Sequence, residues 1–197
     1  MKETNPITWN ENIIIVDADY IDRVAFDLIV NFERMIGRRI PQADLAHWLD
    51  CIALDGGLHE GCDQHTSVVF IHDKTSRKLD NLMPGNYEKD LHQKAFNDNL
   101  GEFMMSAFPV EEDVVKKEDF FLDVTKTLCN LKEVKRVMII PDAEHLYDQV
   151  RQALHDVDED KHITVFTMQP MTGGNFRQEI LGYSLMSALG IKGEELQ

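Results

Sequence analysis

The chain has 197 residues and a mass of 22.7 kDa, with 43% hydrophobic and 28% charged residues. This length and composition are typical of one globular domain, so we expect a single domain over residues 1–197. The 35 acidic residues outnumber the 20 basic residues, which gives a formal net charge of −15. Long-range repulsion therefore opposes general binding to nucleic acids or anionic membranes, unless a local basic groove or a bridging cation overcomes it.

The sequence favours a cytoplasmic protein without a membrane partner. No apolar run approaches the roughly 20 residues that a membrane helix needs. The first residues, MKETNPITWNEN, lack the basic and then apolar pattern of a secretory signal. The cysteines Cys51, Cys62 and Cys129 form no CxxC pair, and any disulfide scheme would leave one of them unpaired.

Five short apolar segments are typical of buried strands. They cover residues 12–16, 67–72, 102–108, 136–140 and 162–168. Several of them are apolar almost without interruption, and this pattern indicates parallel strands that are covered on both faces.

Helical periodicity fills most of the intervening sequence. Apolar residues at three- and four-residue spacing predict helices that cover 24–36, 42–54, 88–97, 117–131, 143–155 and 175–189. The segment 73–87 is predicted to be a loop. Strands that alternate with helices imply βαβ crossovers, so we expect an α/β fold. Its architecture would be a three-layer sandwich around a central, mostly parallel, five-stranded sheet.

Two of the predicted strands end in acidic residues. The first runs into Asp17 and Asp19, and the fourth runs into Asp142 and Glu144. Ligands of open parallel sheets bind beyond the carboxyl ends of strands, where the strand order reverses. If the order is 3-2-1-4-5, these four carboxylates converge, and their mutual repulsion favours a neutralising Mg²⁺ or Mn²⁺. Alternatively, the aspartates are solvated strand ends or helix N-caps.

A third acidic contribution comes from the start of the helix that precedes the fourth strand. Asp119 and Asp123 are four residues apart and share one helix face, so both could point at the same site. Of the two we favour Asp119. Acidic residues in a first turn also stabilise the helix dipole, and this is the simpler interpretation of Glu118.

The order of three segments resembles that of the PIN/NYN-type ribonuclease superfamily. These segments are IIIVDADYID, KKEDFFLDVTKTL and VMIIPDAEHLYDQV. The resemblance implies a Rossmann-like sheet of order 3-2-1-4-5 and metal-dependent cleavage of RNA. It implies that Asp17, Asp119 and Asp142 are catalytic metal ligands, with Asp19 and Glu144 as additional or outer ligands. The implied cofactor is Mg²⁺ or Mn²⁺, which would activate the attacking water.

Two alternatives remain open. Tyr20 stands where the NYN pattern usually has Asn, and Glu144 replaces an Asp. These departures favour a degenerate, non-catalytic interaction module that binds a protein partner or forms a homodimer. Separately, a strand that ends in Asp17-Ala18-Asp19 resembles the haloacid-dehalogenase-type phosphohydrolases. That resemblance implies Asp17 as the nucleophile and Asp19 as the acid and base.

Other polar residues are candidates for secondary roles. His145 follows Asp142 closely and could act as a general acid or contact a phosphate. The residues His59, Cys62 and His65 have an H-x2-C-x2-H spacing with zinc-ligand side chains, but no second ligand pair is visible, so metal binding there stays open. The candidates for contact with an RNA backbone, or simply for solubility, are Arg38, Arg39, Lys74, Arg77 and Lys78.

Overall fold

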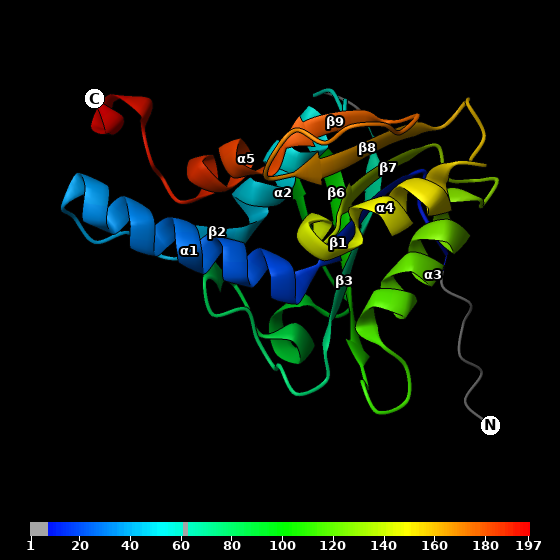
Figure 1. Cartoon of the computed structure of the whole chain (residues 1–197), viewed down its shortest axis with the longest axis horizontal. Helices are drawn as coiled ribbons and strands as arrows, with labels where there is room; N and C mark the ends of the chain where they lie inside the picture. Colours follow the sequence, from blue (N-terminus) through cyan, green and yellow to red (C-terminus); the bar gives the residue numbers. More distant parts are fainter. Residues whose placement is uncertain (1–7, 61–62) are drawn as a thin grey trace.

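The computed structural model describes residues 8–60 and 63–197, which form three layers with a seven-stranded sheet in the middle (Figure 1). The strand order is β5-β6-β3-β1-β7-β8-β9. A separate short pair, β2 and β4, lies outside this sheet. The elements are β1 (Asn12–Asp17), α1 (Ala18–Ile36), β2 (Ala43–Asp44), α2 (Leu45–Asp55), β3 (His65–Asp73), β4 (Leu82–Met83), the π-helical turn η1 (Tyr87–Leu91), β5 (Lys94–Asp98), β6 (Gly101–Val110), α3 (Lys117–Cys129), β7 (Arg136–Ile140), α4 (Ala143–Leu154), β8 (His162–Thr167), β9 (Arg177–Ile180), α5 (Leu181–Ala188) and the 3-10 turn η2 (Gly193–Leu196).

The five strands predicted from the sequence are β1, β3, β6, β7 and β8. They are parallel to one another and lie in the order 3-2-1-4-5. The predicted strand number was wrong, because β5 adds an antiparallel strand at one edge and β9 adds a parallel strand at the other. Their sequences, KAFND and RQEI, lack apolar runs because an edge strand is only partly covered.

Three other local predictions need correction. The helix predicted over residues 88–97 is only the turn η1 followed by β5. The last helix begins at Leu181 and not near Asn175, because the residues before it pair with β8 as β9. The predicted loop 73–87 contains β4 and buries Leu79 and Leu82. In each case, pairing or packing with distant residues overrides the local pattern.

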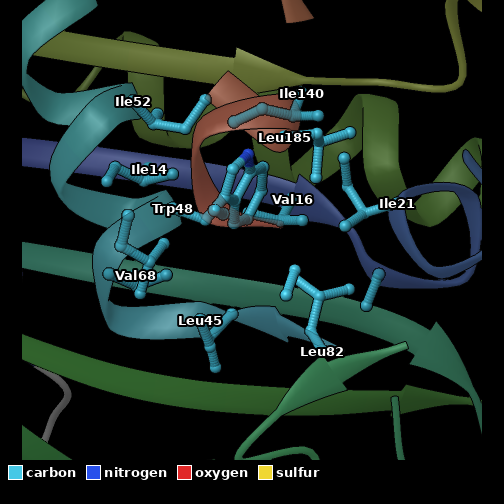
Figure 2. Packing of buried hydrophobic residues seen from close by; sticks show 14 of the residues in the cluster. Ile14, Val16, Ile21, Leu45, Trp48, Ile52, Val68, Leu82, Ile140 and Leu185 are labelled. Atoms are coloured by element: carbon cyan, nitrogen blue, oxygen red, sulfur yellow. The ribbon is translucent and has the colours of Figure 1, made fainter. Parts of the chain in front are cut away.

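The central strand β1 supplies both halves of the core, and all six of its residues are buried. Ile14 and Val16 belong to the core under α1, α2 and α5, whereas Ile13 and Ile15 belong to the core under α3 and α4. Trp48 lies at the centre of the first core (Figure 2). Burial on both faces explains the continuous apolar sequence of this strand.

A pair of carboxylates links α2 to the β5–β6 hairpin. Burial, a hydrogen bond with Asp98 and the charges of Asp98 and Asp44 raise the pKa of Asp50 to about 7. In the unfolded chain this group titrates near pKa ~4, so the folded state binds the extra proton between these two values. We therefore expect the contribution of Asp50 to the free energy of unfolding to fall as the pH rises from about 4 through about 7.

The variant Asp50→Asn should remove this pH dependence, because an amide does not titrate. Urea unfolding at about pH 5 and about pH 8 measures the effect. The exposed Asp123→Asn is the matched control and should keep the wild-type difference. If Asp50→Asn also kept that difference, the proton would not be shared at this pair.

Candidate functional site

Asp17 ends β1 and is also the N-cap of α1, so the strand enters the helix without a loop. Its Oδ1 accepts a hydrogen bond from the backbone N–H of Tyr20 at 3.1 Å. This bond satisfies a free amide of the first helical turn and fixes the carboxylate in place. Only 2% of the Asp17 side chain is exposed, so the carboxylate lies beneath the surface of the carboxyl edge.

The first residue of α3, Lys117, bridges two carboxylates. Its Nζ lies 3.2 Å from Asp17 Oδ1 and 3.0 Å from Asp19 Oδ2. Burial raises the pKa of Asp17, and the neighbouring ammonium opposes that rise. Burial also lowers the pKa of Lys117, but Asp17 and Asp19 more than offset it and leave this pKa above its usual value. The ammonium is therefore the positive charge that allows both carboxylates to be enclosed together.

The end of β3 forms the next part of the site. The backbone N–H of Asp73 donates a hydrogen bond to Asp19 Oδ2 at 2.8 Å. The preceding residue, His72, is buried and stacks on Tyr87 with ring centroids 3.7 Å apart. Burial lowers the pKa of His72, so its ring is neutral at neutral pH. Two stacked and uncharged rings therefore lie beside the ion cluster of Asp17, Lys117 and Asp19.

The end of β7 contributes a second, more open acidic group. His145 Nδ1 lies 3.0 Å from Asp142 Oδ2, and Arg23 Nη2 lies 3.5 Å from the same oxygen. Arg23 is also 3.8 Å from Glu144 Oε2. One ligand atom each from Asp142, Glu144 and His145 lies within 4.8 Å of the others, so these three side chains could hold a metal ion together.

Tyr20 lies beneath this second group on α1. Its side chain is buried, and its hydroxyl has no hydrogen-bond partner among the described residues. Burial, followed by the charges of Glu144 and Asp142, raises the pKa of Tyr20, so the phenol keeps its proton. Buried donors are nearly always satisfied, and a free one near carboxylates is typical of a place that accommodates a water or a polar ligand.

The structure does not bring Asp119 to this group. Asp119 is exposed, and among the described residues no hydrogen bond or ion pair joins it to Asp17, Asp19 or Asp142. Residues two apart on a helix differ by roughly 200° around its axis. Lys117 points toward the end of β1, so Asp119 points away from it. A lysine therefore occupies the position beside Asp17 at which we expected the carboxylate of Asp119.

Several of the basic candidates pair within the chain. Arg38 donates two hydrogen bonds to Glu195, at 2.7 and 3.0 Å. Lys74 Nζ lies 2.9 Å from Glu111, and Lys78 lies 3.8 Å from Asp80. Arg39 and Arg77 are exposed. These carboxylates offset part of the positive charge of Arg38, Lys74 and Lys78. The three side chains are therefore less available to contact a phosphate backbone.

His59 and His65 of the H-x2-C-x2-H sequence lie at the opposite, amino edge of the sheet. His59 and His65 line a cavity of about 390 Å³ there together with Arg136. His65 Nδ1 is 3.6 Å from Glu102. Cys62 lies outside the described residues, so metal binding by this segment stays a hypothesis.

Two charged residues of the site, Lys117 and Arg23, did not stand out in the sequence. A signal for Lys117 was nevertheless present. Phe121, Thr125 and Leu128 form the buried side of α3, and Lys117 lies one turn before Phe121 on that side. A lysine in line with a buried stripe needs a carboxylate partner, which Asp17 and Asp19 provide.

The fold and the site define a three-layer α/β protein with two groups of charged side chains at the carboxyl edge of its sheet. One is centred on Lys117 and the other on Asp142. Residues 6–196 match the family of unknown function DUF6621, so the chain belongs to that family. Neither the curated proteins nor the solved structures yielded a match. In the described part of the chain, no helix has both the length and the apolar character needed to cross a membrane.

The burial of Asp17 predicts a large effect of removing the ammonium beside it. Lys117→Met should lower the free energy of unfolding by about 3 kcal/mol, because the buried Asp17 and the partly exposed Asp19 lose their counter-charge. Adding Asp17→Asn to that variant should recover part of the loss, since one uncompensated charge is removed. Urea unfolding of the three proteins measures both effects.

The neighbouring Lys116→Met is the matched control. Lys116 is exposed and makes no side-chain cap, so its loss should change stability by no more than about 0.5 kcal/mol. Equal destabilisation by Lys116→Met and Lys117→Met would contradict the assigned ion cluster.

Proposed function

We propose that this chain is a divalent-cation-dependent phosphodiesterase with RNA as its substrate class, acting at the carboxyl edge of the sheet. The observation that carries the proposal is the acidic group of Asp142, Glu144 and His145 at the end of β7, because β7 pairs with β1, at whose end Lys117 contacts Asp17. Clustered carboxylates favour a cation, and a positive side chain beside them favours the anionic phosphate. The resemblance to the PIN/NYN-type ribonucleases supports the same chemistry.

The donor set fits the implied cation. Asp142 and Glu144 offer hard oxygen ligands, and His145 offers one ring nitrogen. This mixed set suits Mn²⁺ better than Mg²⁺, which prefers oxygen alone. The free hydroxyl of Tyr20 could donate a hydrogen bond to a water or phosphate oxygen at this place. When bound, the cation would acidify a water and neutralise phosphate charge.

Three side chains at this edge of the sheet would bind the substrate or move a proton. Arg23 is half exposed and already contacts Asp142 and Glu144, so it can bind a non-bridging phosphate oxygen at the entrance. Lys117 is 19% exposed and contacts both Asp17 and Asp19. Asp17 can accept a proton from an attacking water, provided that Lys117 turns toward the phosphate.

Cleavage of a fluorescently labelled single-stranded RNA in Mn²⁺ tests this proposal. Asp142→Asn should lower kcat by about 100-fold or more, because loss of a metal ligand costs more than the roughly 10–100-fold loss from removing a group that orients a ligand. Asp17→Asn should also lose activity. Thermal melting provides a second measurement, since Mn²⁺ should raise the melting temperature of the wild type but not that of Asp142→Asn.

Asp119→Asn is the discriminating control. Its side chain is exposed and away from the site, so we expect wild-type cleavage and a wild-type response to Mn²⁺. Cleavage that survived Asp142→Asn, or that depended on Asp119, would refute this site. A wild type with neither turnover nor a Mn²⁺-dependent shift would favour the non-catalytic interaction module.

One observation supports a second candidate, a phosphohydrolase with a covalent aspartyl intermediate. Lys117 lies beside both carboxylates of the Asp17-Ala18-Asp19 sequence. An Asp17 oxygen would attack phosphorus and the bond to the leaving oxygen would break, while Asp19, in the role of acid and base that the resemblance implies, would pass a proton to that oxygen. The ammonium would balance the charge that moves onto the phosphoryl oxygens.

Beryllofluoride, which mimics an acyl phosphate, separates the two candidates. If Asp17 is the nucleophile, beryllofluoride with Mg²⁺ should raise the melting temperature of the wild type and leave Asp17→Asn unchanged. An absent shift in the wild type, or an equal shift in Asp17→Asn, would remove this candidate.

A further inference from the structure

Arg23 holds a position inside the acidic group at the end of β7. Its Nη2 atom lies 3.5 Å from Asp142 Oδ2 and 3.8 Å from Glu144 Oε2. Together with His145, these two carboxylates are the side chains whose ligand atoms lie within 4.8 Å of one another. The chain therefore places a positive charge of its own at the position where a divalent cation would bind.

The contacts of Arg23 with these carboxylates are weak. Hydrogen bonds between an arginine and a carboxylate are normally about 2.7–2.9 Å long, and both distances here exceed that range. The side chain of Arg23 is 52% exposed, so water screens the two ion pairs. Arg38 shows the contrast, because it donates hydrogen bonds of 2.7 and 3.0 Å to Glu195. Arg23 can therefore leave its carboxylates at little cost in free energy.

Tyr20 lies under the same guanidinium. The Cζ atom of Arg23 lies 5.3 Å from the centre of the Tyr20 ring, which is within the range of a cation–π contact. Only 2% of Tyr20 is exposed, and its hydroxyl has no hydrogen-bond partner among the described residues. Burial raises the pKa of this phenol, and the nearby charges of Glu144 and Asp142 raise it further. A buried hydroxyl that lies near carboxylates without a partner is independent evidence that this group accommodates a ligand.

The balance of charge in this group depends on whether a divalent cation is bound. Asp142 and Glu144 carry two negative charges against the one positive charge of Arg23, so the three side chains are negative overall. A divalent cation would make them positive overall, and the cation and the guanidinium would repel each other at close range. That repulsion favours movement of Arg23 away from the carboxylates. The ring of Tyr20 offers the guanidinium a second favourable contact and keeps it at this edge of the sheet.

A guanidinium released in this way is well suited to a phosphate. Its planar N–H donors can bind two phosphate oxygens at once, which a lysine ammonium cannot do. The phosphate would also offset the positive charge that the divalent cation adds. Lys117, the other cation at this edge, is in contact with Asp17 and Asp19, which do not belong to this group. Arg23 is therefore the side chain that a divalent cation would make available.

From these contacts we infer that Arg23 is a counter-ion that exchanges partners. It pairs with Asp142 and Glu144 until a divalent cation binds them, and it then binds the phosphate of the substrate. The cation and the phosphate therefore bind cooperatively, and each tightens the binding of the other by the same factor. This inference rests on the proposed function for the place of the cation, and it adds the coupling between cation and substrate.

Electron paramagnetic resonance of free Mn²⁺ measures the first consequence on the full chain. Arg23→Gln should bind Mn²⁺ about 10-fold more tightly than the wild type, because the competing positive charge is gone. Arg34→Gln is the matched control, since it removes one positive charge from an exposed position of the same helix. It should bind Mn²⁺ as the wild type does. Circular dichroism should show that both variants are folded.

Dimethyl phosphate, a phosphodiester without sugar or base, tests the coupling. At saturation it should tighten Mn²⁺ binding by the wild type about fivefold or more, whereas Arg23→Gln should lose most of this effect. Arg23→Lys keeps the positive charge but lacks the planar guanidinium. It should bind Mn²⁺ alone as the wild type does and respond less to dimethyl phosphate.

The outcomes separate this inference from the proposed function. If Mn²⁺ binds in an Asp142-dependent way, but Arg23→Gln keeps the wild-type affinity or the full coupling, the role of Arg23 is overturned and the cation site stands. The absence of Mn²⁺ binding by both the wild type and Arg23→Gln would refute the cation site and the inference together. Tighter binding and lost coupling in Arg23→Gln, without cleavage of RNA by the wild type, would confirm the inference and refute the ribonuclease activity.

Discussion

The enclosed ion cluster of Asp17, Lys117 and Asp19 is the constraint on which the arrangement of the carboxyl edge depends. β1 is the central strand and is buried on both faces, so a carboxylate at its end is removed from water unless the chain supplies a counter-charge. Lys117 reaches this position from the start of α3, in the layer on one face of the sheet. The ammonium therefore ties that layer to the beginning of α1 on the other face.

This cluster divides the carboxyl edge into two unlike halves. On the side of β3, the carboxylates Asp17 and Asp19 share the ammonium of Lys117, and His72 is uncharged beside them. On the side of β7, Asp142 and Glu144 are more exposed and have only the half-exposed Arg23 and the imidazole of His145 as partners. Asp142, Glu144 and His145 are the side chains whose ligand atoms lie close enough to hold a cation together, and they lie on the β7 side. The proposed function therefore has its cation there, with Lys117 as a charged side chain of the same edge.

The success and the failure of the sequence-based predictions have the same physical origin. Strands covered on both faces, such as β1 and β7, have continuous apolar sequences that are recognisable without a structure. The edge strands β5 and β9 each pair with one neighbouring strand only, and their polar sequences were assigned to helices. The pairing of β9 with β8 decides its conformation, and such pairing between distant segments leaves little trace in four residues.

The sequence by itself determined the buried strands, their α/β alternation and the presence of acidic residues where β1 and β7 end. It also showed that Asp119 and Lys117 belong to the same helix start. Only the tertiary structure decided that Lys117 faces β1, and that every residue from 26 to 36 of α1 is at least partly exposed. Local sequence sets which residues share a helix face. The rotation of that face toward the sheet, and the point where the sheet ends beneath a helix, are set by packing between distant elements.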